Sequence, residues 1–290
     1  MSIDRRELLK VMGLGLVGSL IEKPSRVLAS SSSSEDSMGM LFDATRCVGC
    51  KKCEAACGER RVSLHPDRVE PELDGPPQDL TADMWTIIKL YQDEEDKTNY
   101  SFVKLQCMHC DDPACVSACP VGALQKTEEG PVIYREDVCF GCRYCMAACP
   151  FNIPKYQWDQ VNPLVQKCDF CADRQAAGLL PACAEACNQG ALLYGKRSDL
   201  LVEAKSRIDK DPGLYVNHVY GEHEVGGTAK LYLSSVPFED LGLPEYQSSA
   251  LPKLTWPWLS ATPGVVLGVG GLMSVLYWAN NKRAEAHKEE

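Results

Sequence analysis

Several signatures of enzymes and of nucleic-acid-binding proteins are missing from this chain. It has no P-loop, no G-x-G-x-x-G fingerprint and no G-x-S-x-G nucleophile elbow, so no substrate pocket is recognisable. No C-x-x-C-H motif occurs, and the chain itself should carry no c-type haem. It has no long basic run, and its formal net charge is −10, which argues against a nucleic-acid partner. These absences predict a protein without an active site of its own.

Cysteine, in contrast, is abundant, with 16 in 290 residues. The cysteines form four groups of four with none left over, and we name these groups the first to fourth runs in chain order. The runs are Cys47, Cys50, Cys53 and Cys57; Cys107, Cys110, Cys115 and Cys119; Cys139, Cys142, Cys145 and Cys149; and Cys168, Cys171, Cys183 and Cys187. A chain of this length can bury a core without disulfide staples, so the cysteines need another explanation.

The spacing within the runs points to iron–sulfur clusters. The first and third runs both read C-x2-C-x2-C-x3-C, which supplies three thiolates from one tight loop and a fourth from the helical turn that follows. Two such runs exchange their last ligands, because each fourth cysteine binds the cluster of the other run. The second run widens one gap to four residues, and the fourth run widens one gap to eleven.

Zinc and disulfides are the alternatives to iron. Zinc knuckles need only paired C-x2-C motifs and do not require the longer C-x2-C-x2-C-x3-C-P pattern. Cysteines two residues apart bond poorly to each other, and closely spaced triplets leave an odd partner. The runs therefore favour four-iron clusters over both alternatives.

The segments between the runs suggest how the runs pair. A turn and a strand at 131–134 join the second run to the third, as in the two halves of a bacterial ferredoxin. The first and fourth runs then form the other module, in which Gly190-Ala191-Leu192 repeats the Gly122-Ala123-Leu124 that follows the second run. Pairing of the third run with the fourth is not excluded, since only 18 residues separate them.

The N-terminus has the form of an export signal. Arg5 and Arg6 precede Glu7-Leu8-Leu9-Lys10, which together match the twin-arginine pattern. The uncharged apolar run that follows has 11 residues and is too short to cross a membrane. We expect the signal to span 1–29 and a serine-rich linker to span 30–39. An amphipathic helix that begins the fold is the alternative, and it would suit a cytoplasmic polyferredoxin.

The C-terminal segment 254–281 has no charged residue over 28 positions and carries tryptophan near both ends. It predicts a transmembrane helix, followed by a cytoplasmic tail at 282–290 because Lys282 and Arg283 favour the inner side. Pro257 and Pro263 suggest that the regular helix begins near Thr262. A buried amphipathic helix is the alternative.

The remaining segments predict ordinary secondary structure. Within a polar insert at 58–106, two strand-like runs could pair as a hairpin, and a strand, a helix and a strand follow the last cysteine. These elements are expected at 84–91, 101–105, 191–194, 199–208 and 229–233. Near the runs, His109 is expected to be a cluster neighbour and not a ligand. Arg46, Lys51, Lys52 and Arg143 either offset cluster charge or are solvated or salt-bridged to a partner.

Three motifs make the chain similar to a known family. They are LQCMHCDDPACVSACPVGAL, DVCFGCRYCMAACPFNIPKY and KCDFCADR. From Met40 to about Pro244, the chain resembles the four-cluster ferredoxin-like iron–sulfur (beta) subunits of membrane-bound respiratory oxidoreductases, and it is most similar to the hydrogenase-2 type. The twin-arginine start and single C-terminal span also fit that type, whereas many formate dehydrogenase beta subunits have no signal of their own.

The resemblance implies four [4Fe–4S] clusters held by all 16 cysteines. The implied ligand sets are Cys47, Cys50, Cys53 and Cys187; Cys107, Cys110, Cys115 and Cys149; Cys139, Cys142, Cys145 and Cys119; and Cys168, Cys171, Cys183 and Cys57. One departure from the family pattern is Asn188, where proline is usual after the last cysteine.

The expected architecture is α+β, with two pseudo-symmetric bacterial-ferredoxin-like modules with insertions and one C-terminal transmembrane helix. The four-cluster domain should span 40–250, with an inner module at about 100–155 and an outer module at about 40–60 plus 160–195. The implied function is electron transfer between a periplasmic catalytic subunit, by resemblance a nickel–iron hydrogenase, and a quinone-reactive integral membrane subunit in the lipid bilayer. The alternatives are a beta subunit of a formate dehydrogenase or another molybdenum or tungsten oxidoreductase and, more remotely, a zinc-binding scaffold.

Overall fold

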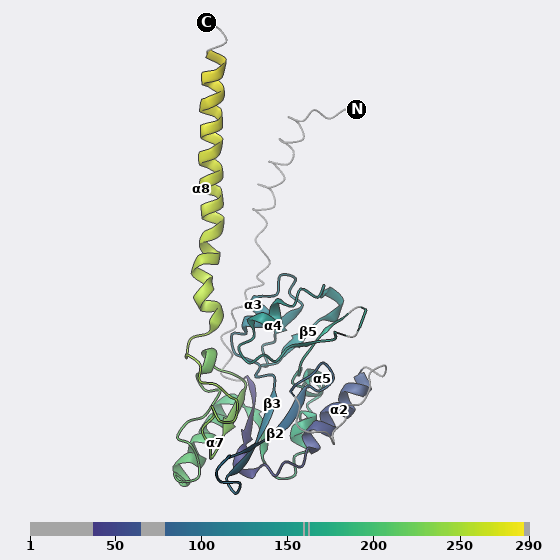
Figure 1. Cartoon of the computed structure of the whole chain (residues 1–290). Coiled ribbons are helices and arrows are strands. Elements are labelled where there is room, and N and C mark those ends of the chain that lie inside the picture. Colours follow the sequence, from purple (N-terminus) through teal and green to yellow (C-terminus); the bar gives the residue numbers. More distant parts are fainter. Residues whose placement is uncertain (1–36, 65–78, 159, 162, 287–290) are drawn as a thin grey trace. The chain divides into compact units, whose positions relative to one another are not determined.

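A computed structural model describes residues 37–64, 79–158, 160–161 and 163–286 (Figure 1). The expected export signal and most of the expected linker lie outside these residues. The first described strand is β1 (Met38–Asp43), and its first two residues belong to the segment 30–39 that was expected to be linker. The α+β architecture is confirmed: short strands pair as small sheets, and helices follow or carry parts of the cysteine runs.

The sheet β8-β1-β9 is the largest sheet in the described part of the chain. Strand β1 pairs antiparallel with β8 (Leu192–Lys196) and parallel with β9 (Lys230–Leu233). Because side chains alternate along a strand, Leu41 faces a cluster built with α7 (Arg197–Lys210), whereas Met40 and Phe42 face the aromatic core beside the cysteines. The sheet is buried on both faces, as the apolar run of β1 requires.

A second small sheet joins β4 (Leu124–Lys126) to β5 (Val132–Tyr134) in antiparallel register. It carries the chain from the second run to the third, as expected. Two further hairpins complete the described strands: β2 (Thr86–Gln92) with β3 (Tyr100–Gln106), and β6 (Lys155–Tyr156) with β7 (Val165–Gln166). The expected β2–β3 hairpin is confirmed, and α2 (Lys52–Leu64) contacts β2 (Figure 1).

The two modules repeat each other closely. Before the first run, β1 leads into the 3-10 turn η1 (Ala44–Arg46), and before the third run β5 leads into η2 (Glu136–Val138). The residues that end these turns have nearly equal backbone angles, φ −77° and ψ 127° at Cys47 and φ −78° and ψ 128° at Cys139. Helix α2 continues the first run, and α4 (Tyr144–Ala148) continues the third.

The second and fourth runs form the other repeated half of each module. Their helices, α3 (Ala114–Ser117) and α6 (Ala182–Glu185), each begin after a proline. After each helix the chain turns through a glycine with φ +65°, Gly122 in one module and Gly190 in the other. The turn after the fourth run is thus retained although Asn188 replaces the usual proline. The expected pseudo-symmetry is confirmed.

The short helix α5 (Ala172–Ala176) follows the first two cysteines of the fourth run.

The described chain ends in one long helix, α8 (Leu251–Ala286). The expected start of the C-terminal helix near Thr262 is wrong, because Pro257 and Pro263 both lie inside α8. Proline removes a backbone donor, but neighbouring turns can keep the helix continuous through such positions. Its segment Leu251–Arg283 contains an 18-residue window with a mean hydropathy of 1.7 and is long and apolar enough to cross a membrane.

Candidate functional site

The four C-x2-C loops share one backbone feature. The residue just before the second cysteine of each loop has a left-handed conformation: Gly49 at φ +67°, His109 at φ +49°, Gly141 at φ +76° and Phe170 at φ +60°. A left-handed residue after right-handed or extended ones turns successive N–H groups toward one concave side, which favours an anion. The loops are therefore shaped to surround a negatively charged group.

All 16 cysteines lie in described residues, and none forms a disulfide. The disulfide alternative finds no support in this arrangement. Six thiols are buried, and Cys50 is exposed. The buried ones are Cys53, Cys107, Cys145, Cys168, Cys171 and Cys183.

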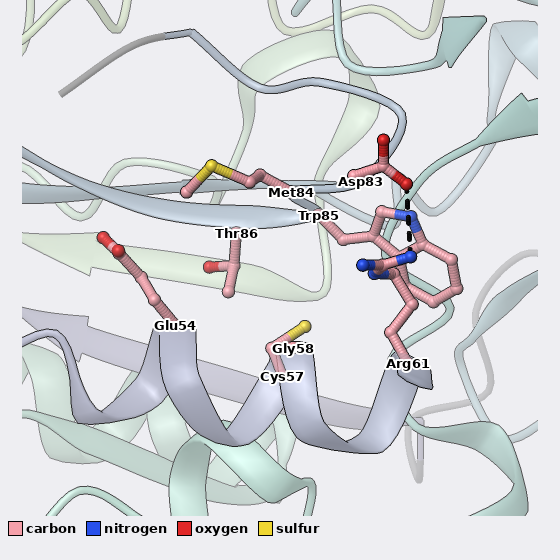
Figure 2. A pocket seen from close by; sticks show the side chains of 8 residues that line it. All are labelled: Glu54, Cys57, Gly58, Arg61, Asp83, Met84, Trp85 and Thr86. Atoms are coloured by element: carbon pink, nitrogen blue, oxygen red, sulfur yellow. Dashed lines mark hydrogen bonds and ion pairs between the residues drawn. The ribbon is translucent and has the colours of Figure 1, made fainter. Parts of the chain in front are cut away.

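The thiols gather across runs. Burial raises the pKa of Cys57 well above its ordinary value, and the thiols of Cys168, Cys183 and Cys171 raise it further. Cys57, the last cysteine of the first run, thus lies among the fourth run. Its side chain projects from α2 into the space between α2 and β2, in a small cavity that is also lined by Glu54 (Figure 2).

The reverse exchange occurs at the other end of the same module. Burial raises the pKa of Cys47, and the thiols of Cys50 and Cys187 add to the rise. The pKa of Cys53 rises to about 11, mainly through burial, with Cys183 and Cys47 contributing. Cys187, the last cysteine of the fourth run, therefore lies beside the first run.

The second and third runs show the same exchange. Burial raises the pKa of Cys110, with further increases from Cys107, Cys149 and Cys115, and Cys149 is the last cysteine of the third run. The pKa of Cys145 rises to about 11 through burial and then through the third-run thiols and Cys119, the last cysteine of the second run. The structure thus brings together four groups, each containing three thiols from one run and one from the paired run.

The residues present fit iron–sulfur clusters. The donors are thiols only, which is the ligand chemistry of such clusters. Backbone amides point at sulfur: the N–H of Ala123 donates to Cys119 Sγ at 3.2 Å, and that of Phe170 donates to Cys168 Sγ at 3.3 Å. No group of three or more ligating side chains in the described ranges converges on a single ion. A four-iron cluster, which takes one thiolate per iron, does not require such convergence.

The two modules meet at a ring contact. His109, from the second run, and Phe170, from the fourth, lie with ring centroids 5.0 Å apart. His109 is 1% exposed, and its Nδ1 accepts a hydrogen bond from the N–H of Val132 at 2.9 Å. Burial and three nearby lysines hold its pKa well below the ordinary value, so the ring is neutral. Cys107 and Cys168 also interact across this junction.

Sequence reasoning missed the buried cations of the site. Arg46, Lys52 and Arg143, which are next to the cysteines in sequence, are exposed. Instead Lys104 and Lys230, at 0% and 1% exposed, lie among the cysteine groups. The sequence does contain a signal for these buried cations, because the apolar strands SFVKL and AKLYL each contain one lysine.

Comparisons with known proteins agree with this geometry. Two family models, each described as a 4Fe-4S dicluster domain, match residues 46–123 and 98–197. A protein of Nitratidesulfovibrio vulgaris is 40% identical over 98% of this chain and 78% of its own length. The hydrogenase-2 operon protein HybA of Escherichia coli O157:H7 is 36% identical over 84% of both chains.

A formate dehydrogenase iron-sulfur subunit of Haemophilus influenzae is 34% identical over 80% of this chain and 76% of its own length. Chains of two different respiratory systems are thus similar to this one over most of their lengths. Since the dicluster models cover all four runs, the chain belongs to the family of ferredoxin-like [4Fe–4S] electron-transfer subunits of membrane-bound respiratory oxidoreductases, which includes HybA and the formate dehydrogenase iron–sulfur subunits.

Proposed function

We propose that this chain relays electrons through four [4Fe–4S] clusters between a catalytic subunit outside the membrane and a quinone-reactive membrane subunit. The clusters supply one-electron transfer when they are bound. The observation that carries the proposal is the assembly of four thiol groups, each of which takes its fourth member from the paired run. The proposed ligand sets are Cys47, Cys50, Cys53 and Cys187; Cys57, Cys168, Cys171 and Cys183; Cys107, Cys110, Cys115 and Cys149; and Cys119, Cys139, Cys142 and Cys145.

Strand pairing supports this assignment independently of the thiols. Strand β1 enters the first run and pairs with β8, which leaves the fourth run. Strand β5 enters the third run and pairs with β4, which leaves the second. Each sheet therefore holds the beginning of one run against the end of its partner. A pairing of the third run with the fourth would not use these sheets.

The fold indicates which module lies nearer the proposed membrane anchor. Helix α3, from the second run, contacts α8. Lys253 at the start of α8 also lowers the pKa of Asp112, a residue whose pKa is raised overall by burial. We infer that the module of the second and third runs lies toward the membrane partner, and that the module of the first and fourth runs lies toward the electron donor.

The export signal at 1–29, the periplasmic position of the clusters and the cytoplasmic tail at 282–290 belong to the same proposal. Clusters are inserted where iron and sulfide are supplied, so a loaded chain has to cross the membrane folded, as a twin-arginine signal permits. Lys282 and Arg283 follow the apolar segment and favour the cytoplasmic side. This orientation places the cluster body on the outer side.

The identity of the catalytic subunit has two candidates of equal standing. The hydrogenase-2 operon protein supports a hydrogenase, and the formate dehydrogenase iron–sulfur subunits support a formate dehydrogenase. Affinity isolation of the complex from membranes, followed by identification of the large subunit, separates them.

Metal analysis tests the proposal. Anaerobically purified protein is expected to contain about 16 iron and about 16 acid-labile sulfide per chain, four of each per cluster. The solution should be brown, and its broad visible absorption should bleach on reduction. Stoichiometric zinc with little sulfide would support the scaffold alternative and contradict the electron-transfer function.

A further inference from the structure

Two lysines are buried beside the fourth run without a carboxylate partner. Lys104 on β3 is 0% exposed, and its Nζ donates to Thr86 Oγ1. Lys230 on β9 is 1% exposed; its Nζ lies 3.2 Å from the ring centroid of Phe170 and 3.5 Å from Met40 Sδ. Within the described residues, neither ammonium group forms a salt bridge with an acidic side chain. Neither position is explained by packing alone, because burying an unpaired ammonium group is costly.

The groups that face these ammonium groups are sulfurs. Lys104 interacts with Cys183, Cys53, Cys57 and Cys168, in decreasing order. These interactions outweigh burial and keep the pKa of Lys104 above its ordinary value. Three of the four thiols belong to the proposed fourth-run set. Thr86, which accepts the hydrogen bond from Lys104 Nζ, lines the same small cavity as Cys57, so the geometry also places this ammonium group beside the fourth-run set.

Lys230 faces the same set from the other sheet. Among the charged groups near Cys168, Lys230 has the largest effect. Its Nζ lies over the ring of Phe170, the residue between Cys168 and Cys171 in the loop of the fourth run, so the ammonium group is held against that loop. The two lysines come from different sheets and converge on one group of thiols.

Arg60 is a further cation near this set, and it is paired with carboxylates. Arg60 donates to both carboxylate oxygens of Asp169, at 3.0 Å and 2.8 Å, and also pairs with Asp173. These carboxylates balance part of its charge: burial raises the pKa of Cys171 overall, Arg60 lowers it, and Asp169 acts on the same thiol in the opposite direction to Arg60. The lysines are different, because neither forms a salt bridge with a carboxylate in the described residues. Burial raises the pKa of the Glu54 carboxyl group overall, and Lys104 is among the groups that lower it.

Reduction adds one negative charge to a cluster, and a nearby uncancelled cation favours the reduced form. We propose that Lys104 and Lys230 are buried counter-ions of the fourth-run cluster and raise its midpoint potential. The inference rests on the proposed function, which places a cluster on Cys57, Cys168, Cys171 and Cys183. It adds the side chains that set the potential of the cluster at the junction of the two modules.

Neutral substitutions test the charge. Lys104→Met and Lys230→Met remove one charge each and keep an unbranched apolar stem. In a redox titration of the anaerobic complex followed by electron paramagnetic resonance, the reduced-to-oxidised ratio of the fourth-run cluster at fixed potential should fall about tenfold in each variant. For one electron this is a downward shift of about 59 mV. A Cys171→Ser variant identifies the signal of that cluster.

Control variants separate charge from packing. Lys205→Met removes a lysine that is 55% exposed on α7, and it should leave the potential unchanged. Lys104→Arg and Lys230→Arg should keep the parent potential. If the methionine variants lose the cluster, its retention in the arginine variants supports the proposal, and its loss there overturns it.

The proposal is also overturned by an intact fourth-run cluster whose potential is unchanged in both methionine variants. An equal shift of the midpoint potential in the Lys205→Met variant would also overturn the proposal. Absence of iron and sulfide from the unsubstituted complex would instead overturn the proposed function, so the two failures are distinct.

Discussion

The Cys119→Ser variant is expected to lose or alter the third-run cluster and to leave the second-run cluster intact. Cys119 belongs to the second run by sequence, but its thiol lies with the third-run thiols around Cys145. Removing one of four thiolates weakens the cluster that it binds. Iron should therefore fall by up to about four per chain, and the spectroscopic loss should be confined to one cluster.

Cys115→Ser is the matched control, because Cys115 is in the same run and only four positions earlier. Its thiol interacts first with Cys107 and then with Cys149, so the damage should fall on the second-run cluster. Electron paramagnetic resonance of the two reduced variants makes the comparison. If both variants damage the same cluster, the exchange of last ligands between runs is wrong.

Truncation after Ala250 is expected to release the chain from the membrane while the clusters remain. Ala250 is 1% exposed and completes the packing of the folded body, so the cut spares the core. No residue in the most apolar 18-residue window of the candidate span that follows is buried within the described chain. Without an anchor, the effective concentration of the chain at a membrane partner falls, and quinone reduction should fall about tenfold or more.

Reduction of an artificial dye by the catalytic partner should continue in the truncated complex, because this reaction needs only the donor side. A chain in which an unrelated transmembrane helix replaces α8 is the control, and it should restore quinone reduction if α8 is only an anchor. Unchanged quinone reduction by the truncated complex would show that the span is dispensable. A C-terminal tag on the intact chain that is reached from outside the cell would show that the orientation is reversed.

The sequence predicts those parts of the fold that local patterns determine. The spacing of Cys47 to Cys57 requires a tight loop followed by a helical turn. The structure has this order, because α2 begins at Lys52, directly after the loop. The repeat of Gly122-Ala123-Leu124 at Gly190 predicts the same turn in both modules, since a left-handed residue favours glycine. The alternating strands at β2 and β3 predict their own hairpin.

Contacts between distant segments were not predictable in the same way. Nothing local shows that Lys104 and Lys230, which are 126 positions apart, face one set of sulfurs. The contact of His109 with Phe170 likewise depends on how two modules meet. The start of α8 was placed too late because proline propensity in soluble helices was applied to an apolar segment, where it constrains less.

The most direct test of the electron-transfer function is freeze-quench electron paramagnetic resonance on membranes that contain the intact complex. On addition of the donor substrate, hydrogen or formate according to the catalytic subunit isolated, the cluster signals of this chain should appear within one turnover. On addition of a quinone, they should disappear at the rate of quinone reduction. Signals that stay absent with the donor, or that persist while quinone is being reduced, would contradict the proposed function.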